Sequence, residues 1–164
     1  MRNLKYLLVF AVAVFSFSCS SEDETPKLVE KSVTIEVEID GNYADYLVTF
    51  SVHSMLSGTS TFVAPVLDQP TELNWTQVIE QGNTYTLSFE PEVPTISATS
   101  SAPIHSLGLV FNAVHLGGGN DDSFQPLSAT VNVLPDGDVY PQFEYEAMSP
   151  GEISVPLAEE ITFQ

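Results

Sequence analysis

Apolar and polar residues alternate with a period of two along most of the chain after residue 32. The clearest run covers residues 33–39, where four aliphatic side chains alternate with three polar ones, and this pattern predicts a strand that buries one face. A turn sequence at 40–42 leads into a second alternating run at 46–53. The simplest prediction for these two runs is a hairpin of antiparallel neighbours.

Further regions show the same alternation, and Pro or Gly residues separate them. They are residues 61–67, 84–89, 107–116, 129–134, 139–145 and 153–157, with 161–163 beyond. Short strands between regular turns, with almost no helical periodicity, predict an all-β fold, and within that class a β-sandwich of about seven to nine antiparallel strands. Residues 74–77 predict one short helical turn, and the polar, proline-flanked segment 91–103 predicts a long loop.

The inward phase of these runs predicts the core. A domain of roughly 130 residues is large enough to bury a single core without covalent cross-links. The residues expected in this core are Ile35, Val37, Tyr46, Val48, Phe50, Trp75, Tyr85, Leu87, Phe89, Leu109, Phe111, Val131, Val133, Phe143 and Tyr145.

The first eighteen residues have the layout of an export signal. Arg2 and Lys5 precede an apolar stretch at 6–17 that leads directly to Ser18 and Cys19. This stretch is shorter than the roughly 18–20 residues that cross a bilayer as a helix, so cleavage is expected. Residues 19–31 are rich in Ser, Glu and Asp and predict a flexible acidic tether. The expected organisation is therefore a signal peptide at 1–18, a tether at 19–31 and one β-sandwich domain at 32–164.

The junction between signal and tether resembles that of a known class of lipoproteins. Phe17-Ser18-Cys19, followed by Ser20-Ser21-Glu22-Asp23-Glu24, is similar to the loose lipobox and acidic export signal of Bacteroidota outer-membrane lipoproteins. The resemblance implies that Cys19 becomes the acylated first residue and that the acids direct the protein to the outer face of the outer membrane. Ser16 departs from the Leu of the stricter lipobox of other bacteria. The alternative is an ordinary signal peptide with an incidental cysteine near its end.

A second resemblance concerns residues 79–89. Ile79-Glu80-Gln81-Gly82-Asn83-Thr84-Tyr85-Thr86-Leu87-Ser88-Phe89 resembles the corner-and-strand segment of fibronectin type III and other immunoglobulin-like domains. The resemblance implies an immunoglobulin-like sandwich in which the hydroxyl of Tyr85 bonds to nearby backbone. The alternative is a plain hairpin with a cross-strand tyrosine.

Charge narrows the range of partners. The chain has 22 acidic and 4 basic side chains, and loss of Arg2 and Lys5 with the signal leaves 2 − 22 = −20 formal charges. Residues 32–164 contain no Lys or Arg. No nucleic acid partner is therefore expected, and direct binding to anionic lipid headgroups is disfavoured, because both ligands are bound through cations. Cys19 is the only cysteine, so an internal disulfide is excluded.

Few residues suggest a metal site. His53, His105 and His115 do not have the spacing of a transition-metal site, since the last two are about 33 Å apart along a straight strand, and ordinary strand histidines are expected. The segments around 121–122 and 136–138 predict either a low-affinity calcium site or simple Asp-Gly turns. The candidate calcium ligands are Asp121, Asp122, Asp136 and Asp138.

No catalytic motif is present in the sequence. It has no Gly-x-Ser-x-Gly elbow, no HExxH pair and no phosphate-binding glycine loop, and Glu36 and Glu38 fall on the outward phase of their strand. We therefore expect a non-catalytic, lipid-anchored module on the extracellular side of the outer membrane that binds a surface protein or glycan. The alternatives are a glycan-acting hydrolase, a calcium-dependent glycan-binding module in which Trp75, Tyr43 or Tyr140 stacks on sugar rings, and a structural subunit that pairs edge strands with neighbours.

Overall fold

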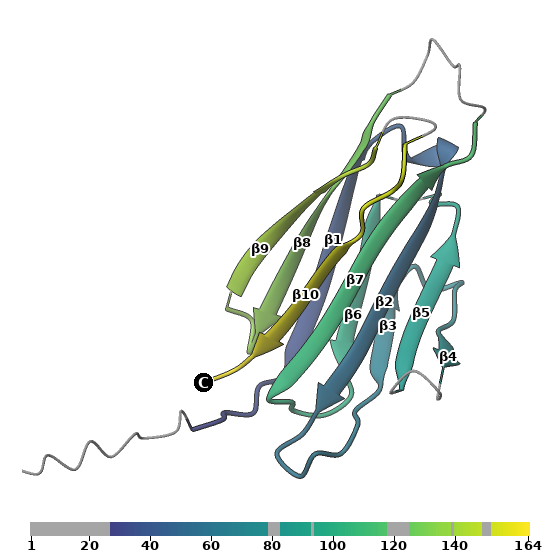
Figure 1. Cartoon of the computed structure of the whole chain (residues 1–164). Coiled ribbons are helices and arrows are strands. Elements are labelled where there is room, and N and C mark those ends of the chain that lie inside the picture. The colour runs from purple at the N-terminus through teal and green to yellow at the C-terminus, as the bar shows by residue number, and fades with distance from the viewer. Residues whose placement is uncertain (1–26, 79–82, 93, 118–124, 139, 149–151) are drawn as a thin grey trace, which may run out of the picture.

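The computed structural model describes residues 27–78, 83–92, 94–117, 125–138, 140–148 and 152–164. They form two antiparallel five-stranded sheets packed face to face, so the predicted all-β sandwich is confirmed, with ten strands instead of seven to nine (Figure 1). Sheet 1 has the order β3 (Pro65–Gln69), β6 (Thr95–Ser100), β1 (Val33–Gly41), β8 (Leu127–Pro135), β9 (Tyr140–Glu146). Sheet 2 has the order β10 (Leu157–Thr162), β7 (Ser106–His115), β2 (Tyr46–Leu56), β5 (Thr84–Phe89), β4 (Thr76–Val78).

The inward phase of the strands forms one continuous core, as the alternation predicts. Phe50 and Phe111 face each other on neighbouring strands and are fully buried. Most of the predicted core residues are buried, whereas Trp75, Phe89 and Phe143 are half-buried and pack against the core from its margin. Tyr85 is half-buried and is not part of the buried cluster.

The predicted hairpin of residues 33–39 and 46–53 is wrong. β1 lies in sheet 1 and β2 in sheet 2, because the short 3-10 helix Tyr43–Asp45 carries the chain from one sheet to the other. Both strands bury their apolar face against the opposite sheet. Two strands joined as a hairpin in one sheet could bury these faces as well as two strands in different sheets. The alternation thus determines which face is buried but does not identify the neighbouring strand.

Two strands lie where the sequence predicts none. The expected loop at 91–103 contains β6, whose inward residues Ile96, Ala98 and Ser100 are buried between outward Thr and Ser side chains. The small apolar residues and the hydroxyls conceal the alternation. The expected helical turn at 74–77 is absent, and β4 pairs there with β5.

Two predicted strands have different bounds. The run at 61–67 becomes β3 only from Pro65, after an isolated bridge between Phe62 and Leu56. The run at 153–157 is not paired until Leu157, and Ile153 is 87% exposed. Alternation within these short runs was therefore insufficient to define where pairing starts.

The last residues of the expected tether are already part of the folded domain. The Val29 amide donates to the Phe163 carbonyl at 3.1 Å, and Lys31 and Ile104 exchange two backbone hydrogen bonds. The Glu30 carboxylate accepts from the Gly58 amide at 2.5 Å. Residue 29 therefore enters the sandwich beside the C-terminal strand, and both ends of the described chain lie at the same end of the molecule (Figure 1).

A buried tyrosine, Tyr145 of β9, connects the two sheets. Its hydroxyl accepts from the Ala113 amide at 3.0 Å and donates to the Ala113 carbonyl at 3.2 Å, and its ring packs edge-on against Phe111. The Tyr85 hydroxyl accepts from the Gln77 side chain at 3.1 Å, and residues 79–82, which form the predicted corner, lie outside the described residues. Tyr145 thus joins the core to the backbone of the opposite sheet.

Tyr145→Phe is expected to lower the free energy of unfolding by about 1–3 kcal/mol, because it removes the hydroxyl that accepts from the buried Ala113 amide. Tyr85→Phe is the matched control, and its exposed hydroxyl predicts a change of less than about 0.5 kcal/mol. Urea unfolding of both variants measures the difference. Equal losses would show that the Tyr145 hydroxyl has no special role in joining the sheets.

Candidate functional site

The sandwich has two distinct ends, which we name the tip and the base. The tip holds Gly41, Tyr46, His115 and Leu127, and the base holds Val33, Leu56, Ser106 and Pro135. Residue 29 enters at the base, and the nine residues of β1 then span about 30 Å to the tip. Any site at the tip is therefore on the opposite end from the chain entry (Figure 1).

An acidic groove of about 510 Å³ lies at the tip on the outer face of sheet 1. Its charged members are Glu38 and Asp40, which follow each other on the outward phase of β1 and are both exposed. In cross-strand register, Glu38 faces Thr95 and Thr130, and Asp40 faces Ser128. The groove is thus lined by carboxylates and hydroxyls, with the backbone of Ile39, Pro94 and Ala129 around them.

A glycine fixes the end of β1 beside this groove. Gly41 has φ +86°, and a Cβ there would lie 2.2 Å from the Pro126 carbonyl oxygen. Its amide donates to the Asp40 carboxylate at 2.7 Å. Only glycine combines this backbone conformation with such a close approach, so Gly41 fixes the position of Asp40.

The acidic surface continues across sheet 1 to its edge. Thr130 donates to the Glu144 carboxylate at 3.1 Å, and Ser128 is in register with Glu146. Glu38 and Glu144 thus lie two strand spacings apart, which is about 10 Å between backbones. No Lys or Arg occurs beyond residue 31 to offset these charges, so this face attracts cations.

Of the four predicted calcium residues, only Asp136 and Asp138 fall within the part of the chain that the structure describes. Asp121 and Asp122 lie outside the described residues, and their described neighbour Gln125 precedes β8 at the tip, whereas Asp136 and Asp138 follow β8 at the base. Asp136 and Gly137 have φ values of 53° and 85°, so they form the two-residue turn that the Asp-Gly pair predicts. The nine residues of β8 separate these two regions by about 30 Å.

Asp136 has a structural partner at the base. Its carboxylate accepts from the Lys31 ammonium at 2.7 Å and from the Ser32 amide at 3.0 Å. The hydrogen bond from Lys31 and the one from Ser32 lower the pKa of Asp136, and the same contact raises the pKa of Lys31. Asp136 therefore ties the entering chain to the turn between β8 and β9.

The three histidines lie in three different environments. His105 is buried at the base, His53 lies against Gly108 on the outer face of sheet 2, and His115 packs edge-on against Tyr46 at the tip. Within the part of the chain that the structure describes, no group of three or more His, Cys, Asp or Glu side chains could hold a metal ion.

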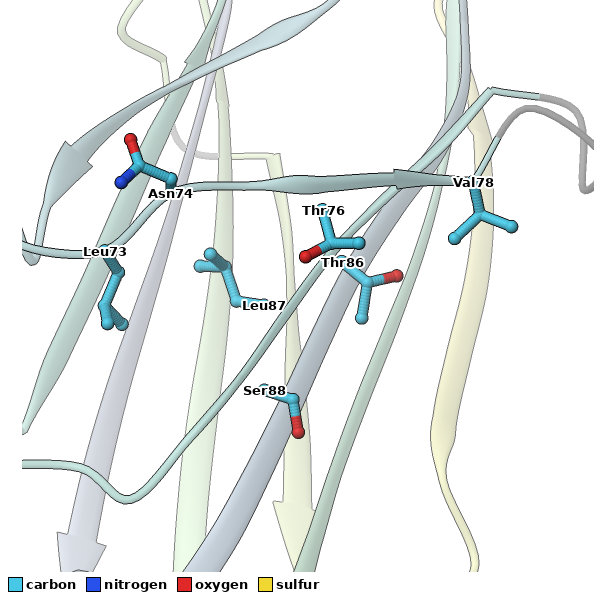
Figure 2. A pocket seen from close by; sticks show the side chains of 7 residues that line it. All are labelled: Leu73, Asn74, Thr76, Val78, Thr86, Leu87 and Ser88. Carbon is cyan, nitrogen blue, oxygen red and sulfur yellow. The ribbon is translucent and has the colours of Figure 1, made fainter.

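A smaller pocket of about 300 Å³ lies beside edge strand β4. Figure 2 shows its lining, which comes from β4, the segment before it and β5, and which contains hydroxyl, amide and aliphatic groups but no charged side chain. Trp75 packs against Phe50 with a ring separation of 5.9 Å. The pocket is lined by Leu73, Asn74, Thr76, Val78, Thr86, Leu87 and Ser88.

The aromatic residues considered for sugar stacking do not form an exposed row. Trp75 and Tyr43 are half-buried and pack against the core, and the side chain of Tyr140 lies outside the described part of the chain. The burial of Tyr46 raises the pKa of its hydroxyl, which donates to the Gln125 carbonyl at 3.1 Å. Among the described residues, the aromatic side chains therefore act mainly in packing.

The edges of both sheets are protected against strand addition. β4 has three residues, β3 begins at Pro65 and contains a register shift, and β9 contains Pro141 and lies beside another register shift. On β10, Glu159 pairs with the buried Leu109 on the inward phase. Short length, proline, bulges and inward charges are the usual devices against edge pairing, so the geometry does not favour assembly through edge strands.

Comparisons with known proteins identify the same fold in three solved structures. No family model and no curated protein matches the chain. A DUF4425 family protein from Bacteroides ovatus ATCC 8483 is similar with a TM-score of 0.56 at 13% identity, over 81% of this chain and 95% of that one. A DUF4425 domain from Bacteroides vulgatus ATCC 8482 has a TM-score of 0.55 at 12% identity, over 82% and 97%.

The third similar structure is the calcium-bound form of a protein from Parabacteroides distasonis. It has a TM-score of 0.59 at 16% identity and covers 86% of this chain and 99% of that one. At these identities, the likeness shows a shared fold. Separately, no helix among the described residues is long and apolar enough to cross a membrane.

The acidic groove is not evident from the sequence. The strand periodicity predicts only that Glu36 and Glu38 face outward, and the segment that becomes β6 and supplies Thr95 has the composition of a loop. The sequence does indicate one part of the groove, because the outward-facing residues of 33–41 and 127–135 are mainly carboxylates and hydroxyls. Only the pairing of β1 with both β6 and β8 shows that these side chains share one surface.

Proposed function

We propose that the protein is a non-catalytic lipoprotein of the outer-membrane surface, acylated at Cys19, whose immunoglobulin-like sandwich is a binding or assembly module. The observation that carries this proposal is that the chain entry and the acidic groove lie at opposite ends of the sandwich. The chain enters at the base, and the groove lies at the tip. The export-signal resemblance at 17–24 adds to it. The three similar structures come from Bacteroides and Parabacteroides species, which agrees with a Bacteroidota-type signal.

The length of the tether fits this arrangement. Val29 follows Cys19 by ten positions, and a random-coil chain of that length has a root-mean-square extension of about 17 Å. The tip would then lie about 50 Å from the bilayer, since β1 adds about 30 Å. Such a geometry leaves the tip free to meet a neighbouring surface protein or glycan.

The arrangement of the acids supports binding over hydrolysis. A glycosidase places two carboxyl groups on opposite sides of the scissile bond and raises the pKa of one of them. Glu38 and Asp40 lie side by side on one strand and are both exposed. The arrangement of these two acids on one open face supports the binding of a ligand.

The mass of the mature protein tests the proposal. Protein extracted from membranes should begin at Cys19 and exceed the polypeptide mass by that of its acyl chains. A mature protein that begins elsewhere, or that has the unmodified mass, would contradict the lipoprotein assignment.

A calcium-dependent module is a second candidate, and the calcium-bound form of the Parabacteroides distasonis protein favours it. Hard cations bind carboxylate and hydroxyl oxygens in flexible or open sites, with dissociation constants of about 0.1–1 mM in extracellular modules. The groove offers the carboxylates of Glu38 and Asp40 and the nearby hydroxyls of Ser128 and Thr130. Calcium would also reduce the repulsion between these carboxylates.

Calcium is expected to raise the melting temperature of the protein. At a hundredfold excess over the dissociation constant, binding adds about 2.7 kcal/mol, which corresponds to roughly 10 °C for a domain of this size. The paired variant Glu38→Gln/Asp40→Asn should abolish the shift if the groove binds calcium, and Asp121→Asn/Asp122→Asn should abolish it if that loop does. Scanning calorimetry with and without calcium distinguishes the two, and an unchanged melting temperature of the wild type would exclude the calcium candidate.

A further inference from the structure

Exposed apolar side chains gather at the tip of this acidic protein. Of the ten large hydrophobic residues that are exposed in the described chain, six lie at or beside the tip. Scattered exposed apolar residues are ordinary, but a contiguous group marks an interaction surface. The six are Leu47, Val114, Leu116, Met148, Ile153 and Val155.

Three of them form one cluster on the outer face of sheet 2. Leu47 and Val114 are directly opposite each other on β2 and β7, so their Cβ atoms are about 5 Å apart. Leu116 follows Val114 by two residues, and its amide donates to the Asp45 carbonyl at 2.8 Å, which continues the pairing beyond the strand. Their exposed fractions are 36%, 47% and 51%.

A segment held against β7 at the tip carries two more exposed apolar side chains. The Ser154 hydroxyl bonds the Asn112 side chain and approaches the Ala113 carbonyl of β7, and Tyr145 is within 3.5 Å of the same hydroxyl. With Ser154 held inward, its neighbours Ile153 and Val155 remain 87% and 64% exposed next to β7. We name Leu47, Val114, Leu116, Ile153 and Val155 the tip patch.

Charge determines what this patch can bind. Glu152 adjoins Ile153 in sequence, and the Asp45 carbonyl accepts from the Leu116 amide. The two lysines that would remain in the mature chain, Lys27 and Lys31, precede the first strand at the base. A second copy of the chain would bring the same acids and a net charge of −20, so its approach is repelled. The complementary partner is apolar at its centre and cationic at its rim.

We propose that the tip patch docks a polypeptide segment of another surface protein in which apolar side chains are flanked by Lys or Arg. The proposal rests on the proposed function in one respect, since anchoring at Cys19 is what keeps the tip away from the bilayer. Apolar contacts on the patch supply affinity, and the surrounding acids supply orientation and a faster encounter. The acidic groove on the other sheet is a separate surface.

A model peptide tests this assignment in solution. The chain from residue 19 to 164, with Cys19→Ser to prevent acylation, contains every described strand, so its result does not depend on the lipid anchor. The probe is a fluorescent twelve-residue peptide of alternating Leu and Lys, and anisotropy measures its binding. We expect saturable binding that Val114→Ser/Leu116→Ser weakens by about tenfold, as for the loss of two central apolar contacts.

Val66→Ser is the matched control, because Val66 is 50% exposed on β3 of the other sheet, and it should leave the affinity unchanged. The second comparison is a peptide of alternating Ser and Lys, which should bind weakly and equally to all variants. Equal losses for both serine variants, equal affinity of the two peptides or an absence of saturable binding would overturn the proposal. A dimer in sedimentation that Val114→Ser/Leu116→Ser abolishes would instead assign the patch to a second copy.

Discussion

Cys19→Ala should move the protein from the membrane fraction to the soluble fraction. Acylation at Cys19 is the membrane attachment in the proposed account, and alanine provides no thiol for it. The apolar stretch at 6–17 is too short to hold the chain in a bilayer, and no described helix could span one. Because several acyl chains give stable attachment where one gives only marginal binding, the expected change is nearly complete.

The neighbouring substitution Ser18→Ala serves as the control, since it preserves the thiol and should leave the protein in the membrane fraction. Fractionation of cells followed by immunoblotting measures both variants. Full membrane retention of the Cys19→Ala protein, with the same mass as the wild type, would require another mode of attachment.

Gly41→Ala is expected to be the most destabilising small substitution near the groove. The positive φ of +86° costs an alanine about 1–2 kcal/mol, and a Cβ placed 2.2 Å from the Pro126 carbonyl oxygen forces the backbone to shift, which costs about 1–3 kcal/mol more. A total of about 2–5 kcal/mol corresponds to a fall in melting temperature of roughly 10–20 °C.

Gly137→Ala separates these two contributions. Gly137 has nearly the same φ, +85°, but no atom lies within 4 Å of the position of its added Cβ. Only the conformational cost of about 1–2 kcal/mol then remains. The free energies of unfolding of the two variants in urea should therefore differ by the cost of the close contact at Pro126. Equal destabilisation would mean that the loop before β8 shifts to accommodate an alanine at position 41 at no cost in stability.

The sequence predicts the layers of this fold better than its connections. Residues 33–39 and 46–53 show which side chains point inward, and Ile35, Val48 and Phe50 are indeed buried. The strands with which they pair are not predictable in this way, because β1 pairs with β6 and β8, which lie more than fifty residues further along the chain. Local alternation contains no information about such distant pairing, and a hairpin was the nearest local solution.

Small and hydroxylated residues account for the strand that was missed. In β6, Ile96, Ala98 and Ser100 point inward while Thr95, Ser97 and Thr99 point outward. Threonine suits a strand, but serine and the flanking prolines suggest a loop. Burial between β3 and β1 outweighs these local preferences, since a central strand gains hydrogen bonds on both sides.

The candidate site was less predictable than the fold. Asp136 has the composition of a cation ligand and is in fact paired with Lys31, which the sequence could not show because 105 positions separate the two residues. Glu38 and Asp40, in contrast, were predictable as outward residues but not as one wall of a groove. Their surroundings come from residues 94–95 and from the start of β8, two segments whose proximity to β1 depends on the full topology.

Labelling of a single introduced thiol at the tip tests the central claim most directly. Leu116→Cys places a thiol at a position that is 51% exposed, and an acylated Cys19 contributes no free thiol in the same chain, which has no other cysteine. On intact cells, a membrane-impermeant maleimide should label the Leu116→Cys protein and leave the wild type unlabelled. Labelling of Leu116→Cys only after cell lysis, or labelling of the wild type itself, would contradict a lipid-anchored module that presents its tip outside the cell.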